Sequence, residues 1–218
     1  FLDGSVINVA LPAISRELGG GLTTQQWVVD AYLITLGSLI LVAGSLSDLL
    51  GRVVVLRAGL IGFGATSVMC ALAPTADWLV LARALQGIAG ALLVPSSLAL
   101  ITSNFDEAPR AKAIGQWTAG TTVAFIAGPL LGGVLVDSVG WRWIFGINVL
   151  PIAVTLYLLA VLRAKDVRKK GVRIDYPGAV LCVLGLAGPV YALIEQGNYG
   201  WGSPLILMPL GLGILCLA

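Results

Sequence analysis

Charged residues within long apolar stretches are the side chains of this 218-residue sequence that could do chemistry. Asp3, Asp30 and Arg83 lie inside apolar runs, and Glu195 lies at the end of one. Because an unpaired charge in hydrocarbon costs at least about 2.5–3.5 kcal/mol, such residues usually mark an ion or substrate pathway. The sequence contains no histidine, which leaves carboxylates as the side chains expected to exchange protons near neutral pH.

Asp30 and Arg83 lie at comparable depth in two different apolar runs. This depth predicts an ion pair or a shared water-filled cavity. Burial favours the protonated form of a carboxyl group and a nearby arginine favours the ionised form, so a site that alternates between the two takes up and releases a proton. The hypothesis is that Asp30 or Asp3 carries the proton and Arg83 tunes it. The alternative is a hydrated Asp30 near the membrane interface, and Glu195 is predicted to be a solvated helix end.

Composition places the chain in a bilayer. It is 58% hydrophobic and 11% charged, whereas soluble domains carry about 25% charged residues. The net charge of +2 argues against a nucleic-acid partner. Cys70, Cys182 and Cys216 lie in apolar runs and are interpreted as packing residues. Without a metal-ligand, nucleophile-and-base or paired-carboxylate constellation, the chain is not expected to be an enzyme, and it needs no metal and no cofactor beyond a proton gradient.

The elements that position these charges are predicted to be transmembrane helices, because about 20 apolar residues span the hydrocarbon and the apolar runs are too long for the strands of a membrane barrel. The fold class is therefore all-α integral membrane. Both ends of the sequence are apolar, so we expect it to be part of a longer protein. The predicted spans are 1–14, 27–47, 54–73, 78–101, 112–136, 143–162, 174–194 and 204–218.

The distribution of basic residues predicts the orientation of these spans. Ten lie in connectors on one side, at Arg52, Arg57, Arg110, Lys112, Arg163, Lys165, Arg168, Lys169, Lys170 and Arg173. The opposite connectors hold only Arg16 and Arg142. The positive-inside rule places the richer side, and the amino terminus, in the cytoplasm. Tryptophans at the predicted outer boundaries are interpreted as interfacial anchors, at Trp27, Trp78, Trp141, Trp143 and Trp201.

The connector between the second and third spans resembles the signature loop of the major facilitator superfamily. The matching residues are Gly44, Leu46, Asp48, Gly51 and Arg52. Glycines permit a tight turn and close helix approach, and Asp48 and Arg52 can hydrogen-bond to neighbouring helix ends in one conformation and release them in another. The resemblance implies a conformational gate at Gly44, Asp48, Gly51 and Arg52. The alternative is a turn that only sets topology.

Four further stretches occur where the drug/proton antiporters of that superfamily carry motifs. They are Leu2 to Pro12, Arg83 to Ala91, Ala124 to Gly133, and Trp141 to Val149. In the predicted span that carries the third stretch, small residues recur every four positions at Gly120, Ala124, Gly128 and Gly132, which places them on one helix face. Pro129 is expected to bend this helix, and Gly133 completes the motif. Plain helix packing is as good an explanation as a gating role.

The resemblance implies the amino-terminal half of a fourteen-span antiporter. Residues 1–162 would form a six-helix bundle, 163–173 a basic cytoplasmic connector that contacts lipid headgroups, and 174–218 an inserted helix pair. The expected function is proton-coupled export of lipophilic or cationic drugs by alternating access, in a bacterial plasma membrane. Substrate would lie near Asn8, Gln86 and Gln116, against a carboxy-terminal bundle outside this sequence. Alternatives are a solute uptake carrier of the same superfamily and a non-transporting membrane scaffold or half-transporter.

Overall fold

The computed structural model describes residues 1–162, Asp166 and residues 175–218. Within these residues all regular structure is helical, which confirms the predicted fold class. The predicted basic connector lies outside the described residues apart from Asp166. The helices are α1 (Leu2–Leu18), α2 (Gly21–Leu50), α3 (Arg52–Ala71), α4 (Ala76–Asn104), α5 (Glu107–Ser138), α6 (Trp143–Gly146), α7 (Val149–Val161), α8 (Tyr176–Tyr199) and α9 (Pro204–Leu217).

Six segments of the described chain are long and apolar enough to cross a membrane by length and composition. They are α2, α3, α4, α5, α6 together with α7, and α8. Several extend beyond the predicted apolar spans, because a helix continues through the polar interface once its backbone hydrogen bonds are established. The α2 helix, for example, runs over Gly21–Leu50 rather than 27–47.

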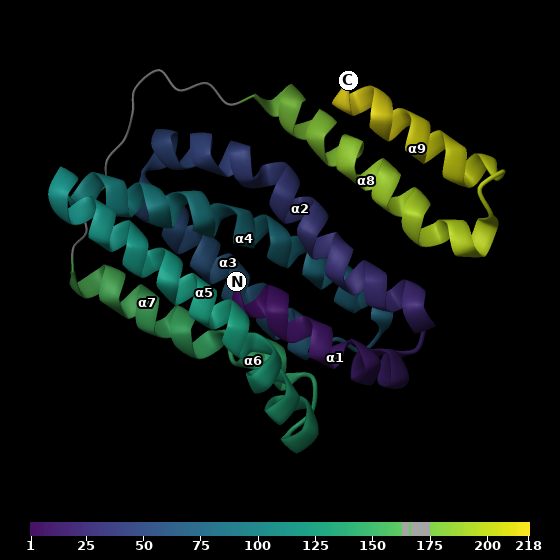
Figure 1. The fold of residues 1–218 in the computed structure, drawn as a ribbon, viewed down its shortest axis with the longest axis horizontal. Helices are drawn as coiled ribbons and strands as arrows, with labels where there is room; N and C mark the ends of the chain where they lie inside the picture. The colour runs from purple at the N-terminus through teal and green to yellow at the C-terminus, as the bar shows by residue number, and fades with distance from the viewer. Residues whose placement is uncertain (163–165, 167–174) are drawn as a thin grey trace.

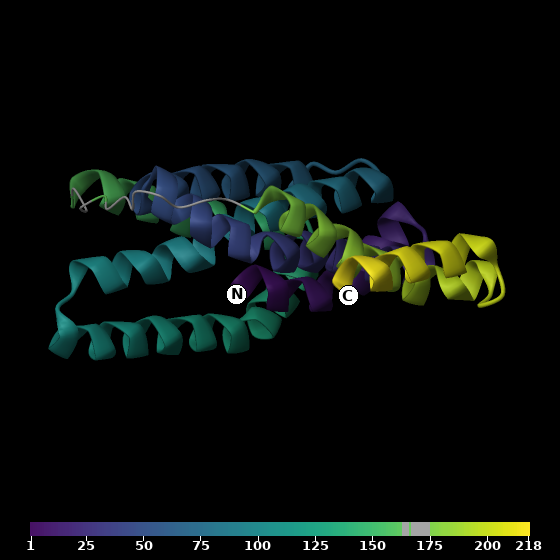
Figure 2. The same cartoon turned by 90° about the horizontal axis from the view of Figure 1, so that it is seen from above.

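The long helices lie side by side, and each packs on a defined neighbour (Figure 1). The α2 and α3 helices pack on α4, and α1 packs on α5. The α8 helix packs on α2 and carries α9 with it, so that this pair lies at one edge of the molecule (Figures 1 and 2). Most large side chains on α5 are exposed, as expected where a helix faces lipid or a further helix.

Small residues permit the closest of these contacts. A Cβ atom added at Gly87 of α4 would collide with the Thr35 hydroxyl and the Tyr32 carbonyl oxygen of α2. The same hydroxyl donates a hydrogen bond to the Ala84 carbonyl oxygen of α4, at 2.8 Å. The absence of a side chain at residue 87 thus brings two backbones within reach of one interhelical hydrogen bond.

Two helix breaks differ from the sequence prediction. The predicted loop between the second and third spans is a single residue, Gly51, whose φ of 112° a side chain would disfavour. The sixth span, predicted as one helix, is divided into α6 and α7 at Ile147 and Asn148. Pro151 follows in the first turn of α7 and has no N–H to continue the α-helical ladder across the break.

One predicted membrane anchor is instead a core residue. Trp141 is 3% exposed and packs in the cluster that contains Ile14, Val28 and Phe145. The prediction that Trp141 is an interfacial anchor is wrong. A tryptophan at a span boundary can equally turn its ring inward and hydrogen-bond its N–H to a group within the protein. Trp143 is 58% exposed, as an anchor requires.

Candidate functional site

Asp3 and Arg83 form an ion pair in the interior of the helical bundle. Asp3 Oδ2 lies 2.6 Å from Arg83 Nη1, and the side chains are 3% and 0% exposed. Asp3 comes from the first turn of α1 and Arg83 from the amino-terminal half of α4. Two opposite charges removed from water must be held by precise geometry and further hydrogen bonds, since their desolvation is costly.

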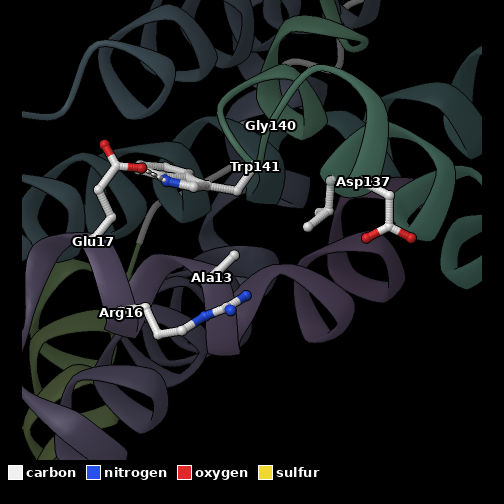
Figure 3. A pocket seen from close by; sticks show the side chains of 7 residues that line it. Ala13, Arg16, Glu17, Asp137, Gly140 and Trp141 are labelled. Carbon is white, nitrogen blue, oxygen red and sulfur yellow. Dashed lines mark hydrogen bonds between the residues drawn. The ribbon is translucent and has the colours of Figure 1, made fainter.

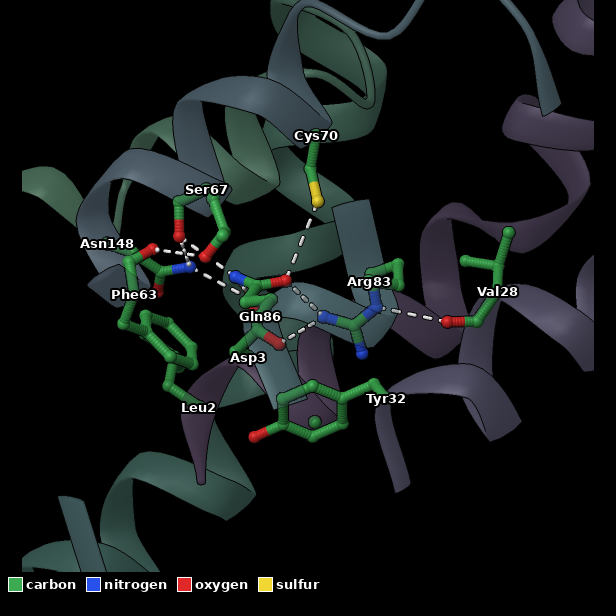
Figure 4. A network of polar contacts seen from close by, with 12 residues as sticks. Leu2, Asp3, Val28, Tyr32, Phe63, Ser67, Cys70, Arg83, Gln86 and Asn148 are labelled. Carbon is green, nitrogen blue, oxygen red and sulfur yellow. Dashed lines mark hydrogen bonds and ion pairs between the residues drawn. The ribbon is translucent and has the colours of Figure 1, made fainter. Parts of the chain in front are cut away.

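Neutral polar side chains complete the surroundings of the Asp3 carboxylate (Figure 4). Gln86 Nε2 donates to Asp3 Oδ1 at 3.3 Å, and Asn148 Nδ2 donates to the same oxygen at 2.9 Å. Ser67 of α3 joins the two amides, because its hydroxyl oxygen lies 2.9 Å from Gln86 Nε2 and 3.4 Å from Asn148 Nδ2. The carboxylate therefore accepts hydrogen bonds from α4 and from the break in the sixth span.

Arg83 is held by several groups at once. Its Nη1 also donates to Gln86 Oε1 at 2.7 Å, and its Nε donates to the Val28 carbonyl oxygen at 3.0 Å. The guanidinium carbon lies 4.2 Å from the centre of the Tyr32 ring, within the range of a cation–π contact. Nη2 is buried and has no hydrogen-bond partner within the described part of the chain.

Cys70 lies next to this network. It is fully buried, and its Sγ lies 3.6 Å from Gln86 Oε1, which accepts a weak S–H hydrogen bond. All three cysteines are free thiols. The interpretation of Cys70 as a packing residue is confirmed, with the addition that its thiol contacts the polar cluster.

A second polar cluster ties together the predicted outer ends of three elements. Glu17 at the end of α1 accepts hydrogen bonds from Trp141 Nε1, at 2.7 Å, and from Arg142 Nη1. Arg142 Nη2 reaches the Ala73 carbonyl oxygen after α3, at 3.1 Å. The Arg142 hydrogen bond, followed by that from Trp141, lowers the pKa of the Glu17 carboxyl, which lies outside the apolar part of α1. An open pocket of about 480 Å³ lies beside it, between α1 and the α5–α6 turn (Figure 3).

A third cluster lies at the predicted inner ends of α2, α3 and α4. Arg52 Nη2 lies 3.4 Å from Asp48 Oδ1, and Arg52 Nη1 donates to the Ala99 carbonyl oxygen of α4 at 2.8 Å. Asp166 Oδ1 accepts from the Val53 backbone N–H at 3.1 Å, so it caps the start of α3. A Cβ atom added at Gly51 would collide with the Asp166 carboxylate. Gly44 faces Pro95 of α4.

Half of the small-residue face on α5 contacts α1. A Cβ atom at Gly128 would collide with the Ser5 side chain, and one at Gly132 would lie 2.8 Å from Val6 Cγ2. Nothing lies within 4 Å of an added Cβ atom at Gly120 or at Gly133. Ala124 is half-buried and Pro129 is exposed. Among the described residues, the carboxy-terminal half of this face packs on α1.

Comparison with known families settles what this bundle is. The sequence model of the Major Facilitator Superfamily matches residues 1–217. The chain belongs to the major facilitator superfamily. It is 41% identical over 218 residues to the puromycin resistance protein pur8 of Streptomyces alboniger, and the alignment covers 99% of the chain and 43% of that protein. It is 38% identical over 215 residues to the methylenomycin A resistance protein of Bacillus subtilis, and this alignment covers 98% of the chain and 46% of that protein.

The chain thus spans less than half the length of these curated relatives. Among solved structures it resembles a peptide transporter POT in complex with sulfate, with a TM-score of 0.67 at 16% identity. That match covers 98% of the chain and 48% of the transporter. At this identity the likeness shows the fold alone. The chain is a multi-span membrane protein of a transporter family, and its relatives include bacterial drug-resistance proteins.

In the structure of this superfamily member, the predicted proton-coupling residues pair differently from the sequence-based prediction. Arg83 pairs with Asp3, and the pair predicted between Arg83 and Asp30 is wrong in this conformation. Asp30 is half-buried on α2 and makes no ion pair with any described residue. Depth along two helices does not determine which of their side chains meet, because lateral neighbours and helix rotation decide contact.

The residues predicted to line a substrate cavity differ in their burial. Gln86 is fully buried in the polar cluster, whereas Asn8 on α1 and Gln116 on α5 are exposed. Glu195 is not merely a solvated helix end, because its Oε1 accepts a hydrogen bond from Trp27 Nε1 at 2.8 Å. That contact joins α8 to α2.

Two members of the Asp3 cluster were not predicted as site residues, Ser67 and Asn148. The available signal was a polar side chain within an apolar span, which in a membrane protein indicates a polar partner.

Proposed function

We propose that the full-length protein is a proton-coupled antiporter that exports lipophilic or cationic drugs by alternating access. The observation that carries this proposal is the buried Asp3–Arg83 pair with its amide donors, in a chain whose relatives are drug-resistance proteins. A bacterial plasma membrane, with the amino terminus of this segment in the cytoplasm, fits the distribution of basic residues. Substrate would be held between this bundle and a carboxy-terminal one.

In this proposal Asp3 carries the proton. Protonation removes its negative charge and thereby weakens the attraction that joins α1 to Arg83 on α4. The freed Arg83 retains its contacts with Val28 and Tyr32 on α2, so the change is concentrated at the interface with α1. A carboxyl group that gains and loses a charge-paired environment during a conformational cycle takes up a proton in one state and releases it in the other.

The proposed route for substrate lies along the exposed polar side chains of α1 and α5. Asn8, Gln116, Thr118 and Thr122 are exposed within these helices. Polar side chains within a membrane span usually face a water-filled cavity or a neighbouring helix rather than lipid. We therefore assign these side chains to the substrate cavity and to the contact with the second bundle.

The inner cluster and the α1–α5 contact are the proposed conformational elements. The Arg52 hydrogen bond to Ala99 and the Asp48–Arg52 pair close the inner ends of α2, α3 and α4. Alternating access requires such contacts to break in one state and form in the other. Gly128 and Gly132 allow α1 to lie directly against α5, so their proposed role is to seal that contact against leakage.

The test uses the purified full-length protein in proteoliposomes with an imposed pH gradient, and ethidium and puromycin as probes. We expect gradient-driven movement of at least one probe against the proton flux. Asp3→Asn should abolish this movement but preserve exchange of probe across the membrane without a gradient. Asp77→Asn, an exposed carboxylate near the predicted outer surface, is the matched control and should transport normally.

Gradient-driven transport that persists in Asp3→Asn would refute the role of Asp3, and Asp30→Asn then tests the other predicted carrier. If a probe moves in the same direction as the protons, the protein is an uptake carrier. If neither probe moves, export of these two compounds is excluded.

A further inference from the structure

The break in the sixth span is a tight turn that lies next to the Asp3 carboxylate. The Asn148 N–H donates to the Phe145 carbonyl oxygen at 3.2 Å, a tighter turn than the α-helical pattern of four residues. Pro151, three residues later, has no N–H to donate back across the break. Such an interruption in a transmembrane helix is a place where the two halves can change their relative direction.

Asn148 lies in this break and directs its side chain to Asp3. Asn148 is 6% exposed, and its Nδ2 lies 2.9 Å from Asp3 Oδ1. Arg83 and Gln86, the other donors to this carboxylate, both belong to the unbroken helix α4. Asn148 is therefore the donor that lies between two helices rather than within one, and its backbone N–H and carbonyl oxygen are bonded to Phe145 and Ile152 on either side.

The other end of α6 is also tied to α1. Trp141 and Arg142, which precede α6, both donate to Glu17 at the end of α1. The short segment from residue 141 to residue 148 is thus attached to α1 at an outer point and at Asp3. The Glu17 contact is half-exposed and lies far along α1 from Asp3. Release of the Asp3 contact alone would let the segment pivot on the outer one.

We propose that Asn148 is a positioning residue that couples the protonation of Asp3 to the break between α6 and α7. When Asp3 is ionised, the Asn148 amide holds the break against α1. When Asp3 binds a proton, its oxygen becomes a weaker acceptor and the break is released. The sixth span then changes its conformation with the protonation of Asp3, and this change reaches the outer half of the bundle. This inference rests on the proposed role of Asp3 as the proton carrier.

Few titratable groups other than Asp3 lie close enough to Asn148 to account for a change in proton binding. Within the part of the chain that the structure describes, the charged and titratable side chains that face the cluster are Arg83 from α4, Tyr32 from α2 and Cys70 from α3. The α6 and α7 helices contain no charged residue. A change in proton binding on removal of the Asn148 amide is therefore attributable to Asp3 and its direct donors.

The experiment is an infrared pH titration of the purified full-length protein, which follows the C=O band of protonated carboxyl groups and requires no substrate. The band of Asp3 is identified by its loss in Asp3→Asn. Because an amide donor stabilises the ionised carboxylate, Asn148→Ala should raise the midpoint of this band by about one pH unit. Pro151→Ala, which keeps the amide but lets the helix continue, should raise the midpoint as well, and the double variant should add little.

Thr155→Val is the matched control. It removes the Thr155 hydroxyl hydrogen bond to the Pro151 carbonyl oxygen on the same helix, at 2.7 Å, without contact to the cluster. Its midpoint should be that of the unmodified protein. An unchanged midpoint in Asn148→Ala or in Pro151→Ala overturns the inference, and so does an equal shift in Thr155→Val. Shifts as expected, in a protein that moves neither ethidium nor puromycin, would support the inference and count against the proposed function.

Discussion

Replacement of Arg83 by methionine tests how the bundle holds a charge in its interior. Methionine retains much of the aliphatic length of arginine but has no donor. The variant would lose the 2.6 Å contact with Asp3, the 2.7 Å contact with Gln86 Oε1 and the 3.0 Å contact with the Val28 carbonyl oxygen. Asp3 would remain buried with only amide donors.

The cost of this replacement follows from the carboxylate that is left behind. Breaking a buried ion pair by removing one partner costs about 3–5 kcal/mol. Asp3 can limit this cost by taking up a proton. Protonation of a carboxylate becomes more favourable by about 1.4 kcal/mol for each pH unit, and therefore by about 2.7 kcal/mol between pH 7 and pH 5. We therefore expect Arg83→Met to destabilise the protein by about 4 kcal/mol at pH 7 and by roughly half of that or less at pH 5.

The measurement is the free energy of unfolding of the full-length protein in mixed micelles, at both pH values. Asp3→Asn in the Arg83→Met background removes the unpaired charge, so the double variant should be more stable than Arg83→Met alone by about 2 kcal/mol or more at pH 7. Arg57→Met is the control, because this exposed arginine makes one hydrogen bond with the described residues, to the Leu159 carbonyl oxygen. It should cost no more than about 1.5 kcal/mol at either pH.

A cost of Arg83→Met that is the same at pH 5 and pH 7 would refute this reasoning, because it would mean that Asp3 does not become an isolated carboxylate. Additive effects of the two substitutions would refute it as well. Either result would indicate that water or another side chain replaces Arg83 beside Asp3.

Three further substitutions, with Gly133→Ala as a control for one of them, test other contacts in the bundle. Gly128→Ala should destabilise the protein by about 1–3 kcal/mol, since the added carbon collides with α1, whereas Gly133→Ala meets open space and should not destabilise it. Glu17→Gln should lower the free energy of unfolding by at most about 1 kcal/mol at pH 7, because the side chain is half-exposed. The Arg142 hydrogen bond lowers the pKa of Glu17 in the folded protein. The stability difference between the unmodified protein and Glu17→Gln should therefore persist down to the ordinary pKa of about 4.3 and vanish at pH values below the lowered pKa. Gly51→Ala should cost about 1–3 kcal/mol because of its positive φ. Thermal unfolding measures all of these.

Each has a result that contradicts it. Equal stability of Gly128→Ala and Gly133→Ala would mean that α1 and α5 are not in close contact. A difference between the unmodified protein and Glu17→Gln that grows as the pH falls would reverse the sign of the Glu17 linkage. A Gly51→Ala variant as stable as the unmodified protein would show that the α2–α3 break adopts another backbone conformation.

Much of this fold could be predicted from the sequence because membrane insertion depends on properties that are local to each segment. A run of about 20 apolar residues satisfies its backbone as a helix wherever it packs. The helix order and the charged residues within the spans followed from that rule. Helix ends and breaks were less accurate. Gly51 alone separates α2 from α3, and Pro151 follows a break that hydropathy does not register.

The sequence by itself determined that the chain crosses a membrane repeatedly, and that Asp3, Asp30 and Arg83 lie within apolar stretches. Only the tertiary structure decided that Arg83 meets Asp3 and that Asn148 and Ser67 complete the cluster. The physical reason is that a helix presents side chains in every direction around its axis. Which of them meet depends on lateral neighbours and rotation, set by packing across α1, α3, α4 and the sixth span together, and no single segment encodes that choice.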